Sequence, residues 1–121
     1  MKSCLIVDDT RTIRSIVKKM VTGFGFQPVE AENGLQALQA CDKQIPDVIL
    51  LDWNMPVMNG LEFLKSLRAR PDGVAPIVIF CTTENALDRI QEGIEAGANE
   101  YIMKPFDEGI LRDKFVQVGL L

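Results

Sequence analysis

Residues 48–60 read VILLDWNMPVMNG, in which four apolar residues precede Asp52 and a loop with Pro56 and Gly60 follows it. A short apolar run is typical of a strand that is buried on both faces of a parallel sheet. Because this run stops at an aspartate, the carboxylate is predicted to lie at the carboxyl end of the strand. Open α/β sheets bind their ligands just beyond that end, so Asp52 is predicted to belong to a binding site.

Three other apolar runs end in the same way. Residues 5–7 run into two aspartates, residues 77–81 into two threonines, and residues 101–103 into Lys-Pro. A lone aspartate after a strand often does no more than cap the next helix, but the combination of these strand ends is specific. Because parallel strands end along one edge of the sheet, the polar groups are expected to share one pocket. The predicted site contains Asp8, Asp9, Asp52, Thr82 and Lys104.

A weaker strand is predicted over residues 26–31, and helical periodicity predicts helices over 11–22, 35–44, 61–70, 86–96 and from 107 onward. Thr10 or Asp9 is expected to cap the first helix. Five strands that alternate with five helices predict an α/β fold, a parallel sheet with helices on both faces. The residues expected to face the sheet include Ile13, Ile16, Val17, Met20 and Val21 in the first helix, and Ile90 and Ile94 in the fourth.

Composition limits the function. At 121 residues the chain is expected to be one domain, residues 1–121, without an output domain. The net charge of -4, with no block of Lys or Arg, favours neither nucleic acid nor an anionic membrane. No signal peptide or membrane-spanning run is visible, so a cytoplasmic location is expected. The chain has no histidine, which excludes histidine-dependent nucleophiles, histidine-ligated metals and a phosphohistidine of its own.

Several single residues have expectations of their own. The three cysteines match no metal-binding or disulfide spacing and are expected to be small buried hydrophobes in a reducing compartment. Trp53, the only tryptophan, is expected to be semi-exposed in the loop beside the site, and Glu84 is expected to be solvated.

Three neighbouring carboxylates repel one another, and a divalent cation removes that repulsion. Mg²⁺ prefers oxygen ligands in octahedral geometry, and Asp9 and Asp52 are predicted as direct ligands. Asp8 is predicted to act through a water molecule, and the backbone carbonyl of Asn54 is predicted to supply one further oxygen. Together with Lys104 and Thr82, the cation would form a receptor for a phosphoryl group. Asp52 is then positioned as a nucleophile that forms an acyl phosphate.

This set of residues resembles the receiver domain of two-component response regulators, and especially the single-domain chemotaxis regulators. The resemblance implies a flavodoxin-like sheet of order 2-1-3-4-5. It implies that Asp52 is the phosphoacceptor, that Asp8 and Asp9 hold Mg²⁺, and that Lys104 and Thr82 contact the phosphoryl group. Tyr101 would couple Thr82 to a partner face made by the fourth helix, fifth strand and fifth helix. The resemblance rests on Asp8-Asp9, residues 52–60, Thr82-Thr83, Tyr101 and Lys104-Pro105-Phe106, and it implies a cis bond at Lys104-Pro105.

The leading hypothesis is a phosphorylation switch rather than an enzyme, with self-phosphorylation and self-dephosphorylation as its intrinsic chemistry. Its donor would be a histidine kinase or a phosphotransfer protein, and its output would be phosphorylation-dependent binding of a downstream protein, as in chemotaxis. A phosphate sink or a relay intermediate is the alternative. An aspartyl-phosphate phosphatase of the haloacid dehalogenase type would need an acid where Asn54 stands. A flavin carrier is disfavoured because Asp8-Asp9 would repel the phosphate of the flavin. A constitutive scaffold is disfavoured because the acidic site is intact.

Overall fold

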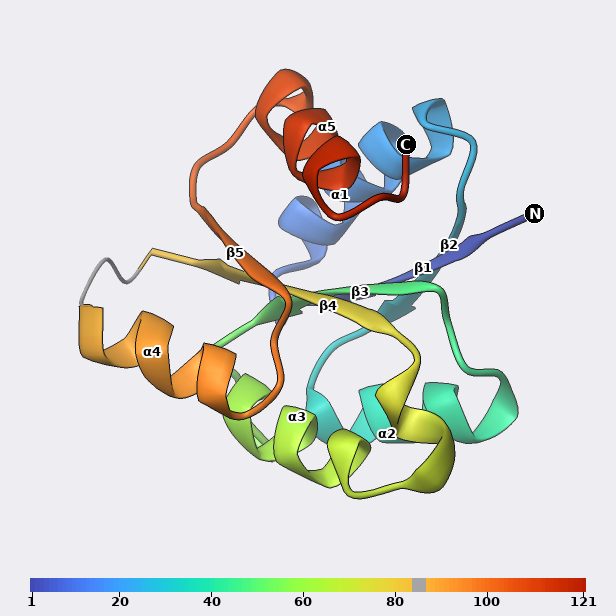
Figure 1. The fold of residues 1–121 in the computed structure, drawn as a ribbon. Coiled ribbons are helices and arrows are strands. Elements are labelled where there is room, and N and C mark those ends of the chain that lie inside the picture. The colour runs from blue at the N-terminus through green and yellow to red at the C-terminus, as the bar shows by residue number, and fades with distance from the viewer. Residues whose placement is uncertain (84–86) are drawn as a thin grey trace.

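The computed structural model describes residues 1–83 and 87–121, and within them the predicted α/β fold is confirmed (Figure 1). The strands form one parallel sheet in the order β2-β1-β3-β4-β5. The strands are β1 (Ser3–Val7), β2 (Gln27–Ala31), β3 (Val48–Asp52), β4 (Ile77–Thr82) and β5 (Glu100–Met103). The helices are α1 (Arg11–Gly23), α2 (Gly34–Lys43), α3 (Gly60–Arg68), the 3₁₀ turn η1 (Pro71–Val74), α4 (Leu87–Glu95) and α5 (Glu108–Gln117).

Helices cover both faces of the sheet: α1 and α5 lie on one side, and α2, α3 and α4 lie on the other (Figure 1). Successive strand residues point to opposite faces, so each strand contributes to two cores. In β1, Leu5 and Val7 pack in the core under α2 and α3, whereas Cys4 and Ile6 pack in the core under α1 and α5. The short apolar runs of the sequence are therefore strands buried on both faces, as predicted.

Short polar side chains cap the N-termini of α2, α3 and α5. The side chain of Asn33 accepts a hydrogen bond from the N–H of Gln36 at the start of α2, and Asn59 and Glu62 form a capping box at the start of α3. Asp107 caps α5 through the N–H of Ile110. Thr10 is the N-cap residue of α1, as expected, but its side chain makes no capping hydrogen bond.

Three burial predictions are also wrong. Ile16 in α1 is 48% exposed and Ile94 in α4 is 44% exposed, whereas Trp53 is only 5% exposed. The buried stripe of α1 is Arg14, Val17 and Val21, and a residue two positions from Arg14 lies on nearly the opposite side of a helix. Sequence periodicity missed this rotation because it treats arginine as a surface residue. Trp53 is buried because its ring packs against Phe80, with 4.8 Å between the ring centres.

The cysteines are buried, as expected. The helices of the described residues include none with the length and apolar character that a membrane span requires. Two predictions fall on residues 84–86, namely Glu84 as a solvated residue and Ala86 as the first residue of the fourth helix, and both lie outside the described residues.

Candidate functional site

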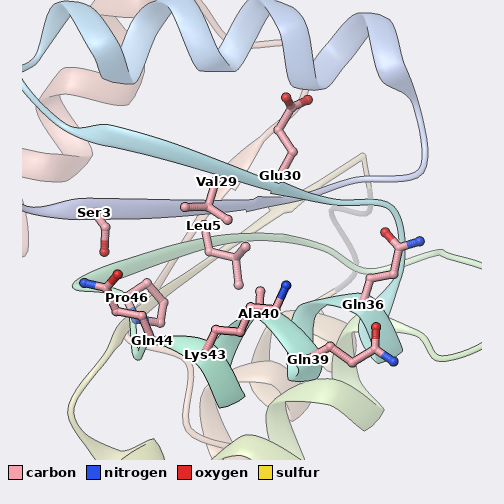
Figure 2. A pocket seen from close by; sticks show the side chains of 10 residues that line it. All are labelled: Ser3, Leu5, Val29, Glu30, Gln36, Gln39, Ala40, Lys43, Gln44 and Pro46. Atoms are coloured by element: carbon pink, nitrogen blue, oxygen red, sulfur yellow. The ribbon is translucent and has the colours of Figure 1, made fainter.

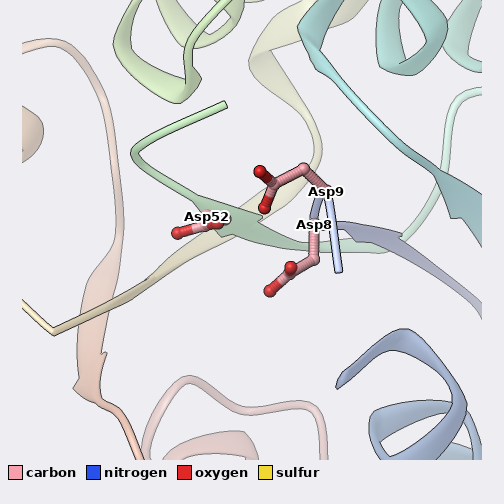
Figure 3. A group of neighbouring side chains, drawn as sticks. All are labelled: Asp8, Asp9 and Asp52. Atoms are coloured by element: carbon pink, nitrogen blue, oxygen red, sulfur yellow. The ribbon is translucent and has the colours of Figure 1, made fainter. Parts of the chain in front are cut away.

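Three carboxylates converge where β1 and β3 end. Asp8 and Asp9 follow β1, and Asp52 is the last residue of β3 (Figure 3). Because β1 and β3 are paired neighbours, with Val7 opposite Leu51, the two chain ends emerge side by side. One carboxylate oxygen from each aspartate lies within 4.8 Å of the others. The convergence that the sequence predicted is present, although the function of each residue remains a prediction.

Asp8 is almost fully buried, and hydrogen bonds hold it on every side. Its N–H donates to the carbonyl of Ala31 at 3.1 Å, and its Oδ1 accepts the N–H of Thr10 at 2.8 Å. Its own carbonyl accepts a hydrogen bond from Arg14 Nη1 at 2.7 Å. Asp8 is therefore a fixed part of the site, whereas Asp9 is exposed to solvent.

Lys104 lies between two of the carboxylates. Its Nζ is 2.6 Å from Asp8 Oδ2 and 3.5 Å from Asp52 Oδ1. Its backbone N–H donates to the carbonyl of Thr82 at 2.9 Å, and the Lys104-Pro105 bond is cis, as expected. Burial by itself would lower the pKa of Lys104, but the hydrogen bond to Asp8 and the charges of Asp52 and Asp8 outweigh it and raise the pKa. The ammonium therefore stays charged across the physiological pH range.

Asp52 has a side chain that is only 14% exposed. Its Oδ1 accepts a hydrogen bond from the N–H of Trp53 at 2.8 Å. Burial raises the pKa of Asp52, Lys104 opposes that rise, and the neighbouring Asp8 adds to it. A carboxylate that is costly to ionise in the metal-free protein is one whose charge a bound cation would stabilise.

Space is scarce around the backbone of Asp52. A Cβ on Gly60 would collide with the Asp52 carbonyl, so only glycine fits at the first residue of α3. The N–H of Gly60 donates to the Trp53 carbonyl at 2.9 Å, which closes the loop over residues 53–60. Asn54 is exposed in this loop, and its carbonyl as a metal ligand remains a prediction.

The predicted switch residues lie next to this cluster on β4 and β5. Thr82 is buried at the end of β4, and Tyr101 on β5 is half-buried, with Lys114 Nζ 5.3 Å from its ring centre. A cavity of about 10 Å³ is lined by Thr82, Tyr101 and side chains of the β3–β4 region and α4. Within the described residues, a hydroxyl, an aromatic ring and a small void therefore adjoin the carboxylate site.

Two contacts near the site were not predicted. One is the buried Arg14 on the Asp8 carbonyl. The other is Arg89 of α4, whose guanidinium lies 5.3 Å from the ring centre of Trp53. In the sequence, Arg14 and Arg89 look like ordinary polar positions on amphipathic helices, and only the packing of the helices reveals their neighbours.

The donor set suits a hard divalent cation. The three aspartates offer oxygen ligands, and Mg²⁺ is usually bound by one or two carboxylates together with waters or phosphate oxygens, which matches two direct ligands and a third that acts through a water. The residues present therefore fit the ion that the sequence predicted.

A larger cavity of about 440 Å³ lies elsewhere, between the β1–β2 edge of the sheet and α2 (Figure 2). Its lining has an apolar floor that includes Leu5, Val29 and Ala40, and a rim with Gln36 and Lys43. None of the five predicted site residues lines it, so it is separate from the carboxylate site.

A model of the response regulator receiver domain matches residues 4–116. The chain belongs to this family. The receiver is 40% identical over 116 residues to a chemotaxis protein CheY homolog of Campylobacter jejuni, which covers 94% of this chain and 89% of that protein. It is 41% identical over 109 residues to the sporulation initiation phosphotransferase F of Bacillus subtilis, which covers 90% of this chain and 86% of that protein.

Solved structures agree with the fold. The chemotaxis response regulator CheY4 of Vibrio cholerae superposes with a TM-score of 0.92 at 35% identity, over 98% of each chain. The receiver is therefore a response regulator domain of the chemotaxis-regulator type, a class whose members act as phosphoacceptor switches.

Proposed function

We propose that this receiver accepts a phosphoryl group on Asp52 in a Mg²⁺-dependent reaction and then signals by binding another protein. The observation that carries the proposal is the Asp52 carboxylate, which lies within 4.8 Å of the Asp8 and Asp9 carboxylates and 3.5 Å from Lys104 Nζ. The donor is a phosphohistidine on a histidine kinase or phosphotransfer protein, because this chain has no histidine.

In the transfer, a carboxylate oxygen of Asp52 bonds to phosphorus while the bond from phosphorus to the donor nitrogen breaks. The electron pair of that bond stays on the imidazole of the donor. When bound, Mg²⁺ would supply positive charge that offsets the charge of the phosphoryl group. Asp8 and Asp9 would hold the ion, and Lys104 and Thr82 stabilise the transferred oxygens by charge and hydrogen bonding.

The output is a shift between two conformations. The phosphoryl oxygens draw the Thr82 hydroxyl inward, and Tyr101 follows toward the vacated space beside the small cavity. The partner binds the face made by α4, β5 and α5. A ligand shifts such an equilibrium only by its differential affinity for the two states, commonly about 1–3 kcal/mol of coupling. We propose a cytoplasmic site of action with protein partners, without nucleic acid or membrane.

Fluorescence of Trp53 tests the proposal, because its N–H donates to Asp52 Oδ1. Mixing the protein with Mg²⁺ and a small acyl phosphate should change the fluorescence over time, and the same mixture without Mg²⁺ should not. Asp52→Asn should abolish the change, whereas the exposed Asp113→Asn should keep it. An equal response in Asp52→Asn would contradict the proposal.

The switch has its own test. Thr82→Ala should still take up the phosphoryl group but should lose the change in amide exchange over residues 87–106. Tyr101→Trp should alter partner affinity while Mg²⁺ affinity stays as in the wild type. Identical exchange in phosphorylated and unphosphorylated wild-type protein would place the switch elsewhere.

A relay intermediate or phosphate sink is the second candidate. The support is the 41% identity to a protein named as a phosphotransferase. Incubation of the phosphorylated receiver with a histidine phosphotransfer domain separates these functions. Passage of label to the histidine would favour a relay, and rapid release as inorganic phosphate without partner binding would favour a sink.

A further inference from the structure

A buried arginine lies behind the carboxylate site, outside the residues that the proposed transfer uses. Arg14 extends from the second turn of α1 and is 7% exposed. A buried guanidinium is costly unless hydrogen bonds and charge partners satisfy it. Its position in the stripe of α1 that faces the sheet therefore requires an explanation from its contacts.

Those contacts join two separate parts of the chain. Arg14 Nη1 donates to the Asp8 carbonyl at 2.7 Å, and Nε donates to Glu30 Oε1 at 3.2 Å. The Asp8 carbonyl belongs to the peptide unit between Asp8 and Asp9. A hydrogen bond to this carbonyl therefore fixes the peptide plane from which the Asp9 side chain departs.

The other polar groups of Asp8 are held by neighbours in or beside the site. Its N–H is held by the Ala31 carbonyl, Oδ1 by the N–H of Thr10, and Oδ2 by Lys104. These bonds orient the Asp8 side chain and the peptide unit that precedes Asp8. Of the hydrogen bonds that the described residues make to Asp8, the one from Arg14 acts on the peptide unit that leads to Asp9.

Glu30 braces the guanidinium from the edge strand β2. Its side chain points away from the cavity floor at Val29, toward the helix above the sheet (Figure 2). Lys18 Nζ lies 3.7 Å from Glu30 Oε2, so this carboxylate contacts two cations of α1. Because Glu30 accepts from Nε, the guanidinium is held with Nη1 directed at Asp8.

We propose that Arg14 is a positioning residue for the metal site, with Glu30 as its brace. It fixes the Asp8–Asp9 peptide unit so that both carboxylates are already placed to hold Mg²⁺. Groups that orient metal ligands commonly change metal affinity by about 10–100-fold when they are removed. The inference rests on the proposed function in so far as Asp8 and Asp9 are the metal ligands.

The first test is a Mg²⁺ titration followed by Trp53 fluorescence, at a temperature where each variant is fully folded. Arg14→Met keeps the apolar stem but removes the donors, and Mg²⁺ binding should weaken about tenfold. Arg14→Lys keeps the charge without the fork that reaches both Asp8 and Glu30, and binding should weaken at least threefold. Lys18→Met is the control, since Lys18 contacts Glu30 without reaching Asp8, and it should bind like the wild type.

The second test needs no metal. In metal-free Arg14→Met, or in Arg14→Lys if the first variant does not fold, the amides of residues 8–10 should exchange at least tenfold faster, relative to amides of β3 and β4. If Arg14 only stabilised the fold, its replacement would lower the midpoint of thermal unfolding but would change neither the Mg²⁺ affinity nor the exchange of these amides. If the wild type does not respond to Mg²⁺, the metal in the proposed function is wrong and amide exchange alone decides the function of Arg14. Wild-type exchange, or wild-type Mg²⁺ affinity, in a folded variant would overturn the inference.

Discussion

Lys104 and Asp8 are 96 residues apart in the sequence, yet Lys104 Nζ lies 2.6 Å from Asp8 Oδ2. This ion pair joins the end of β5 to the end of β1 across the carboxylate site. In the metal-free protein, the ammonium therefore provides the positive charge that balances a nearly buried carboxylate.

Replacing Lys104 by methionine should make stability depend on Mg²⁺. Removal of one partner from a buried pair costs about 3–5 kcal/mol, because the remaining charge is left uncompensated. We expect Lys104→Met to unfold at lower temperature than the wild type without metal, and to recover much of the difference with Mg²⁺. Thermal unfolding with and without the ion checks this. An equal loss under both conditions would mean that Lys104 does not share its carboxylate with the metal.

The pKa of Asp52 predicts a pH dependence of stability. Burial raises this pKa in the folded protein above the value in the unfolded chain. The folded state then binds the proton more tightly, so stability rises as pH falls through the folded pKa and is lower above it. In metal-free buffer, Asp52→Asn should therefore stabilise the protein at neutral pH and lose that advantage at acidic pH. Urea unfolding of both proteins at neutral and acidic pH measures this difference. A gain in stability of Asp52→Asn that does not depend on pH would contradict the prediction.

Arg68 is expected to be a strong determinant of stability away from the site. Its guanidinium donates to the carbonyls of Gly73, Pro76 and Gly97, and so joins α3 to η1 and to the end of α4. Arg68→Ala should cost about 2–4 kcal/mol, because several part-buried carbonyls lose their partner. Arg70→Ala is the matched control, since it removes one ion pair to the exposed Asp42 and should cost less than about 1 kcal/mol. Denaturant unfolding measures both losses of unfolding free energy, and similar values for Arg68→Ala and Arg70→Ala would refute this ranking.

The cysteines should be unreactive in the folded protein. Burial raises the pKa of the Cys81 thiol to about 12 and that of Cys41 to about 11, and it raises the pKa of Cys4 as well. Because the thiolate is the reactive form, a thiol reagent at neutral pH should label the native protein slowly. Full labelling should follow denaturation. Rapid labelling of Cys81 in the native state would instead indicate a reactive thiol near the end of β4.

The sequence predicted the fold well because its signals are local and repeated. Apolar runs that end at Asp8, Asp52, Thr82 and Lys104 identify both the strands and the edge where they meet, and parallel pairing then brings the side chains together. The resemblance to receivers supplied the strand order, which no local pattern contains.

What the sequence could not predict depends on the rotation of helices and on distant contacts. The periodicity of α1 suggested Ile16 as a buried residue, whereas Arg14 is buried because its partners lie outside the helix, Asp8 just after β1 and Glu30 on β2. Trp53 is buried for a similar reason, since Phe80 comes from β4 and Arg89 from α4. From the sequence, a polar residue on a helix can be predicted to be buried only when the residue that it contacts is already known.

The most direct test of the central claim is the mass of the intact protein after incubation with a small acyl phosphate. We expect one phosphoryl group to be added only when Mg²⁺ is present, hydroxylamine to remove it, and Asp52→Asn never to gain it. A phosphoryl group that persists in Asp52→Asn, resists hydroxylamine and maps to a serine or threonine would contradict the account.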